Sequence, residues 1–110
     1  MTMIKIAAHV GSGNLLSTGG IYEGDPPVTG RPNLLDKTNG PNWSKELGAG
    51  KFTFQIDAAG DKGSDLTVTI TGADGTTPKT TTVTLEGPGP AVVRMIKNFP
   101  FTVGADGSVS

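Results

Sequence analysis

Side chains that could perform acid–base, thiol or metal chemistry are few in this chain of 110 residues. His9 is the only histidine and there is no cysteine, which excludes disulfides, thiol chemistry and the usual zinc and copper sites. A Ser-His-Asp arrangement would need a nucleophile held against the imidazole, and no nucleophile motif lies near His9. We therefore expect His9 to be a surface or interface residue, and we predict neither a catalytic site nor a bound cofactor.

Carboxylates gather beside turns in the second half of the chain, at Asp57, Asp61, Asp65 and Asp74. Oxygen ligands of this kind can bind Ca2+. Their spacing differs from an EF-hand loop, in which ligands alternate and a glutamate closes the site. We interpret them as solvated turn residues and predict no metal site.

Two glycine-rich stretches superficially resemble phosphate-binding loops. Residues 11–14 lack the third glycine of a dinucleotide fingerprint, and no βαβ unit follows them. Residues 48–51 lack the P-loop spacing and the hydroxyl residue after the lysine. We interpret both as turns. The formal net charge of −1 offers no basic stripe, so we expect neither a nucleic acid nor a membrane partner.

Apolar and polar residues alternate with a period of two through residues 51–103, which predicts antiparallel strands with one solvated face. Many of the polar positions are threonines, as is typical of such a face. Residues 4–10 show the same alternation and predict a first strand. Residues 72–80 contain Asp-Gly and predict a hairpin-type connection.

The end of the chain has a different pattern. Residues 91–97 are denser in apolar side chains, and we expect them to be buried on both faces of a sheet. Pro100 predicts an edge strand or a bend, because proline cannot donate to a strand ladder. Residues 104–110 predict a frayed tail.

Residues 11–50 hold almost no alternation and include much of the glycine and proline of the chain. Residues 24–33 are incompatible with a helix or a central strand, because their prolines fix the backbone and remove donors. Residues 44–47 could form one helical turn. We predict a single domain over 1–110, with 11–50 as an extended loop or arm and 51–103 as the main sheet region.

The expected fold is all-β, with very little helix. It is a small antiparallel β-sandwich or barrel of six to seven strands, immunoglobulin-like or jelly-roll-like, with a long Gly/Pro-rich loop or arm.

Large apolar side chains are scattered through residues 11–50, whereas a disordered linker would carry fewer of them. We predict that this segment lies along another protein surface and orders there. Trp43, in a polar stretch, is either an interface anchor or the cap of a local core, and Tyr22 has the same ambiguity. The candidate interface residues are Ile21, Tyr22, Leu34, Leu35 and Trp43.

The Gly/Pro segment from Gly11 to Gly50 and the Thr-faced strands from Lys51 to Glu86 resemble small accessory virion proteins of tailed bacteriophages, especially head decoration or cement proteins. The resemblance covers most of the chain but contains no diagnostic motif, so no residue role is carried over. It implies a non-enzymatic virion protein that binds the major capsid protein or another virion protein and stabilises the shell. It also implies a homo-oligomer, with a trimer favoured, that is assembled in the host cytoplasm.

A carbohydrate-binding or adhesion β-sandwich module of a tail fibre or a cell surface is the alternative. In that case Trp43 and Tyr22 would stack on sugar rings. Residues 1–10 show no signal-peptide pattern, and no stretch approaches transmembrane length, so we expect a protein that is neither exported by a leader nor inserted in a membrane.

Overall fold

The structure is a computed structural model, which describes residues 1–11, 16–24, 33–39 and 42–110. These residues contain strands and turns and no helix, so none of the described residues forms a helix that is long and apolar enough to cross a membrane. The eight strands are β1 (Thr2–Val10), β2 (Leu16–Glu23), β3 (Leu34–Asn39), β4 (Asn42–Leu47), β5 (Gly50–Asp61), β6 (Asp65–Thr71), β7 (Lys79–Thr84) and β8 (Val92–Val103).

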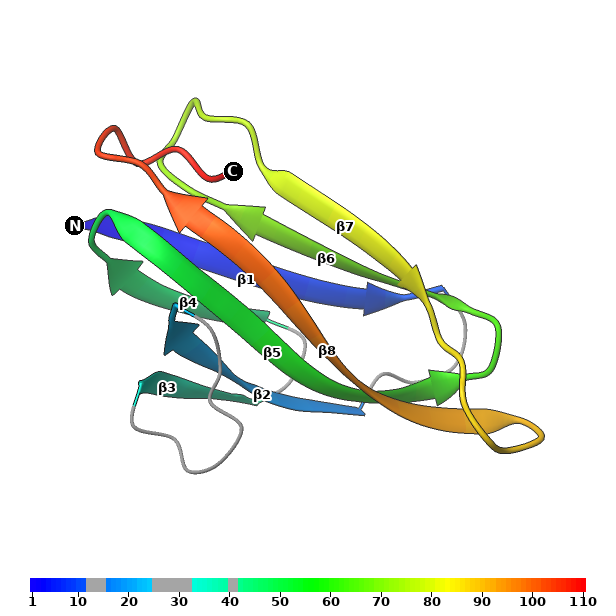
Figure 1. Ribbon diagram of the computed structural model, residues 1–110. Helices are drawn as coiled ribbons and strands as arrows, with labels where there is room; N and C mark the ends of the chain where they lie inside the picture. The colour runs from blue at the N-terminus through cyan, green and yellow to red at the C-terminus, as the bar shows by residue number, and fades with distance from the viewer. Residues whose placement is uncertain (12–15, 25–32, 40–41) are drawn as a thin grey trace.

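The strands form two four-stranded antiparallel sheets that pack face to face (Figure 1). We name them the β1 sheet, in the order β4-β1-β6-β7, and the β5 sheet, in the order β3-β2-β5-β8. Neither sheet closes on itself, and the molecule measures 45 × 34 × 18 Å. The predicted all-β sandwich is confirmed, with more strands than the six to seven expected, and the alternative of a closed barrel is excluded.

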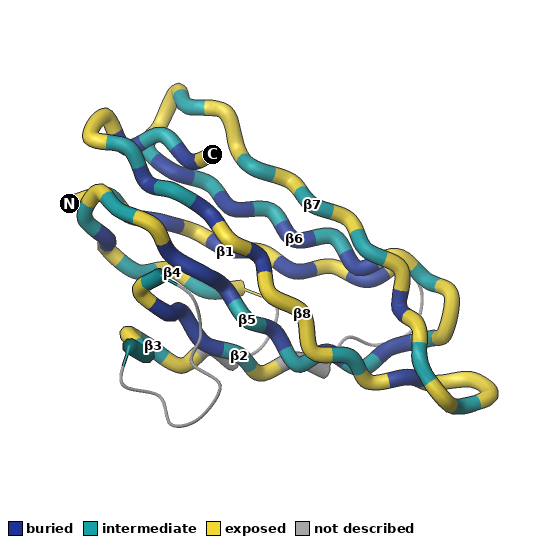
Figure 2. The backbone as a smooth tube through the Cα atoms, viewed as in Figure 1, coloured by how far each residue is buried: buried dark blue, intermediate teal, exposed yellow. Residues whose placement is uncertain are grey.

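The inner face of the β1 sheet follows directly from the two-residue alternation. β1 and β6 pair with Ile6 opposite Ile70 and Ala8 opposite Val68. Residues directly opposite in an antiparallel pair share a face, so these side chains all point into the core. Ile4 is 0% exposed in the same row. Buried positions alternate with exposed ones along β1 and with half-buried ones along β6 (Figure 2).

The inner face of the β5 sheet is built on two aromatic pairs between β5 and β8. Phe52 stacks on Phe101 with ring centroids 5.7 Å apart, and Phe54 stacks on Phe99 at 6.3 Å. All four rings are buried. Each pair lies directly across the strand ladder, so side-chain stacking reinforces the backbone pairing of the two longest strands.

Three strands lie within residues 11–50, the segment that the sequence predicted as an extended loop or arm. β2 is an internal strand between β3 and β5, and β4 pairs with β1, so residues 44–47 are strand and not a helical turn. Gly20 explains why the alternation is hidden in β2. A Cβ there would lie 2.7 Å from Cδ1 of Leu34 and 3.3 Å from the carbonyl oxygen of Asp36, so glycine lets β3 pack closely against this strand position.

Two predictions for this segment lie outside the described residues. They concern the glycine-rich stretch over 12–14 and most of the proline-rich run, over 25–32.

Two predictions for the second half of the chain are confirmed. β6 and β7 form a hairpin, and Gly75 in its connection has a φ of 84°, a conformation that glycine adopts without strain. Pro100 lies in β8, which is an edge strand.

Residues 104–110 do not form the frayed tail that the sequence predicted. Thr102 and Ser110 exchange two backbone hydrogen bonds, of 2.9 and 3.0 Å, and Val103 forms a bridge with Val109. The carbonyl oxygen of Gly107 also accepts a hydrogen bond from the N–H of Ala73, at 2.9 Å. Val109 is 7% exposed, so the returning chain closes one end of the core.

We expect Gly72→Ala to destabilise the fold by about 1–3 kcal/mol, because an added methyl group overpacks this closure. A Cβ at Gly72 would overlap the carbonyl oxygen of Gly107 and lie 2.9 Å from Cγ2 of Val109. The midpoint of urea unfolding measures the effect. Gly48→Ala is the matched control, because no atom lies within 4 Å of a Cβ there. Equal midpoints for the two variants would contradict the described closure.

Candidate functional site

The side chains that could take part in acid–base chemistry or metal binding lie apart in the fold. His9 is exposed on the outer face of β1, opposite Thr67. Asp57 lies on the outer face of β5, Asp65 begins β6, and Asp74 lies in the connection between β6 and β7. Within the part of the chain that the structure describes, no group of three His, Cys, Asp or Glu side chains could hold a metal ion. The geometry therefore directs attention to surfaces rather than to a reactive centre.

Two of the five candidate interface residues are buried by the chain itself. Ile21 is 0% exposed and lies between the two sheets. Tyr22 is 4% exposed, opposite Thr53, which is also buried. The hydroxyl of Thr53 donates to the carbonyl oxygen of Gly24 at 2.7 Å, so the chain leaving β2 is tied to β5 at this point. Packing between the sheets accounts for Ile21, whereas Tyr22 is buried on the outer face of the β5 sheet, beside Thr53.

The two leucines of β3 differ in exposure. The side chain of Leu34 is half-buried against Gly20. The pairing of β2 with β3 shifts between Ile21 and Tyr22, which leaves Leu35 out of the register. Leu35 is 38% exposed and is thus available for contact with another molecule.

Trp43 lies in β4 and not in a polar loop. It is opposite Ile6, half-buried, and packed against the core. Of its two possible roles, the structure shows the cap of a core. One side of Trp43 also borders a surface hollow.

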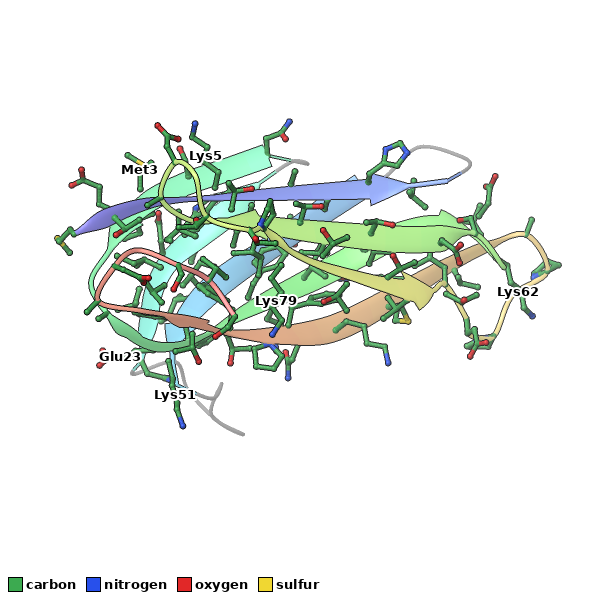
Figure 3. All side chains as sticks on the ribbon, turned by 90° about the horizontal axis from the view of Figure 1, so that it is seen from above. Met3, Lys5, Glu23, Lys51, Lys62 and Lys79 are labelled. Atoms are coloured by element: carbon green, nitrogen blue, oxygen red, sulfur yellow. The ribbon has the colours of Figure 1, made fainter. Side chains whose placement is uncertain are left out.

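This hollow is open, has a volume of about 600 Å³, and lies on the outer face of the β1 sheet. Ala7 creates it, because this small side chain lies opposite Asn42 on one side and Thr69 on the other. Lys5 projects from the same side of β1 (Figure 3). Most of the accessible surface of the hollow is apolar, and a few hydroxyl, amide and ammonium groups around it can form hydrogen bonds with a ligand. Its lining includes Lys5, Asn42, Trp43, Ser44, Thr69 and Thr71.

A second surface feature is the exposed middle of β8, at the edge of the β5 sheet (Figure 2). Val92 and Ile96 are each 61% exposed, so the prediction that residues 91–97 are buried on both faces is wrong. Ile96 lies opposite Asp57 on the outer face, whereas Val93 faces the core. The sequence prediction missed this surface because residues 91–97 are rich in apolar side chains. That richness hid the two-residue alternation between inner and outer faces.

An ion pair lies beside Ile96 on this outer face. Arg94 donates from Nε to Oδ1 of Asp57 at 2.7 Å, and from Nη2 to Oδ2. The hydrogen bonds and the positive charge of Arg94 lower the pKa of Asp57, although partial burial of the carboxylate opposes this shift. The Arg94 side chain is 75% exposed, and solvent weakens a pair of this kind. Its main effect is to hold Arg94 on its own chain.

We expect Asp57→Asn to remove a small, pH-dependent part of the stability. The folded pKa of Asp57 is lowered, so its contribution is complete above the unfolded value, near 3.8, and is lost as the pH falls through the folded value. The difference in urea midpoint between the wild type and Asp57→Asn should therefore shrink between pH 6 and pH 2, about two units to either side of an ordinary carboxyl pKa.

Arg94→Gln provides the control for this pair. It should show the same loss at neutral pH, and the double variant should add little to either single variant. A difference that stays constant with pH would show that Asp57 acts through something other than its charge.

No family model, no curated protein and no solved structure matches this chain. The proposal of a function therefore rests on the surface features of the chain itself.

Proposed function

We propose that this chain is a non-enzymatic structural protein of a phage virion, a decoration or cement protein that binds the lattice of the major capsid protein and stabilises the shell. The observation that carries the proposal is the exposed middle of β8. Ile96 in that stretch, and Val92 where β8 begins, present apolar surface on a strand at the edge of a sheet. Apolar side chains on an open strand edge are a common means by which β proteins bind other proteins.

The rest of the molecule suits a rigid accessory subunit. The two aromatic pairs fasten the longest strands of the β5 sheet, and the returning C-terminal residues close the core. The formal net charge of −1 suits a contact made by shape and apolar anchors rather than by long-range attraction. Many copies on one lattice would add avidity that a single small contact lacks. A homo-oligomer, with a trimer favoured, belongs to this proposal.

The accessible members of the candidate interface lie at the opposite edge of the sandwich from β8 and would belong to a second contact. Leu35 is 38% exposed at the edge strand β3, and Trp43 borders the hollow beside β4. Ile21, Tyr22 and Leu34 would act indirectly, by holding the strands that present Leu35.

Co-sedimentation with expanded, undecorated capsids tests the proposal, with capsids assembled from the major capsid protein of the virion to which the chain would belong. We expect saturable binding in a fixed ratio to capsid subunits and a higher melting temperature of the decorated shell. Val92→Glu should weaken binding tenfold or more, which corresponds to about 1.4 kcal/mol. Thr84→Glu, on an exposed position of β7, is the control and should bind normally. A chain that stays in the supernatant at saturating capsid would refute the proposal.

A carbohydrate-binding or adhesion module is the second candidate, and the hollow beside Trp43 favours it. Its hydroxyl and amide lining is of the kind that bonds sugar hydroxyls. A glycan array provides the test, with Asn42→Ala expected to abolish any signal and Thr84→Ala to leave it intact. Trp43→Phe is preferable to Trp43→Ala, because Trp43 also packs against the core. An array without binding would remove this candidate.

A further inference from the structure

We propose that two copies of this chain associate through β8, edge to edge and antiparallel, about a two-fold axis at Ile96. The two β5 sheets then form one continuous sheet across the contact. The inference goes beyond the proposed function. A second copy would occupy the same edge of β8 as a capsid surface, so this edge serves one contact at a time, and the two-fold pair is distinct from the trimer of the proposed function.

The backbone of β8 shows which groups are open to such a contact. Thr102 directs its N–H and C=O to Ser110, and the carbonyl oxygen of Pro100 accepts a hydrogen bond from Nζ of Lys79 at 2.7 Å. Lys79 reaches from β7 toward β8 (Figure 3). Both groups therefore point away from β5. Strand residues alternate in this respect, and the β5–β8 register is unbroken from Gly50–Val103 to Asp61–Val92.

It follows that Arg94, Ile96 and Asn98 also direct their N–H and C=O groups away from β5. Among the described residues, no strand pairs with this side of β8. The open stretch has a definite end. Pro100 has no N–H, and Thr102 already bonds to Ser110. The other end is set by the turn after β7, because Cβ atoms at Gly89 and Gly87 would lie 3.0 Å from the carbonyl oxygen of Val92 and 3.9 Å from that of Arg94. Ile96 thus lies between this turn and Pro100, at the centre of the open stretch.

This open stretch is self-complementary. Antiparallel pairing about Ile96 places Ile96 opposite Ile96 of the second copy, and Arg94 opposite Asn98. Each free N–H then meets a free C=O. The two Ile96 side chains, each 61% exposed in the single chain, cover one another on the outer face. Strand pairing and apolar burial thus favour the same register.

The charged side chains also favour this register. Arg94 stays paired with Asp57 on its own chain and faces the neutral Asn98, which accepts a hydrogen bond from Gln55 at 3.0 Å. Lys97 lies opposite Ile56, at an inward-facing position of the edge strand, and is exposed. Pairing about Lys97 would oppose two ammonium groups at the closest approach of two strands, so Lys97 disfavours that neighbouring register.

Cysteine cross-linking tests the register directly, because the chain contains no cysteine of its own. In Ile96→Cys, the two thiols would lie on directly opposite residues with Cα atoms about 5.5 Å apart, within the range of about 4.4–6.8 Å for a disulfide. We expect this variant to form a covalent dimer rapidly under mild oxidation. Val92→Cys is the matched control, on the same face of the same strand and at the same 61% exposure.

In the proposed register, residue 92 lies opposite Pro100 of the second copy, roughly 27 Å from residue 92 of that copy at about 3.4 Å per residue. Val92→Cys should therefore stay monomeric under the same conditions. Equal cross-linking of the two variants, or no cross-linking of Ile96→Cys, would overturn the proposal.

Light scattering after size-exclusion chromatography tests the contact without cysteine chemistry. We expect Ile96→Glu to lower the average mass of the wild-type chain toward that of a monomer, and Thr84→Glu to leave it unchanged. Circular dichroism verifies that both variants are folded. An oligomer that Ile96→Glu does not disturb would place the contact elsewhere and refute the proposal.

Discussion

Strand β5 carries the contacts on which the rest of the sandwich depends. It pairs with β2 on one side and with β8 on the other, and its inner face supplies Phe52, Phe54, Ile56 and Ala58 to the core. Further along, the side chains become smaller. A Cβ at Gly60 would lie 2.8 Å from Cδ1 of Leu85, so glycine at this position lets the chain beyond β7 approach the β5 sheet closely. Side-chain size thus falls along β5 from phenyl rings to glycine. The two sheets can approach each other more closely where the side chains of β5 are small.

The two sheets differ in what they offer to other molecules. The outer face of the β1 sheet is polar and is hollowed at Ala7. The β5 sheet ends in an exposed apolar strand edge. On that side of the sandwich, the edges of both sheets are partly occupied, since Lys79 of β7 is bonded to Pro100 of β8. The open part of β8 is therefore confined to its middle, which favours a short and specific contact over indefinite strand addition.

The sequence predicted the sandwich class and the strands of the second half, because those strands alternate clearly and are bounded by turns. It did not predict β2, β3 and β4. In β2, Gly20 stands where an outward side chain would show the period, and the register shift at Leu35 breaks the pattern of β3. Trp43 looked like a loop residue because its neighbours Asn42 and Ser44 are polar. That polarity marks the outer face of β4, opposite Ala7 and Lys5.

The surface features were less predictable than the fold for a related reason. Ile96 is exposed because it lies on the outer face of β8, opposite Asp57. The open backbone beside it depends on β8 being the last strand of its sheet, and strand order arises from tertiary pairing rather than from local pattern. Burial of Ile21 likewise depends on tertiary pairing, which places it opposite Phe54 on the inner face of the β5 sheet. From sequence alone, an apolar residue in a loop-like stretch suggests an anchor for binding another protein. In this chain such residues belong to strands, so the stretch is not a loop.

The position of β1 has a consequence for how the chain acquires this fold. β1 is the first strand along the chain, yet it lies between β4, which begins at Asn42, and β6, which begins at Asp65. Its partners are distant in sequence, so chain entropy must be lost before any pairing of β1 is gained, which is typical of slow-folding topologies. During synthesis, the apolar face and both edges of β1 emerge from the ribosome before β6 exists to cover them. The nascent chain is therefore most vulnerable to misassociation in the interval before β6 arrives.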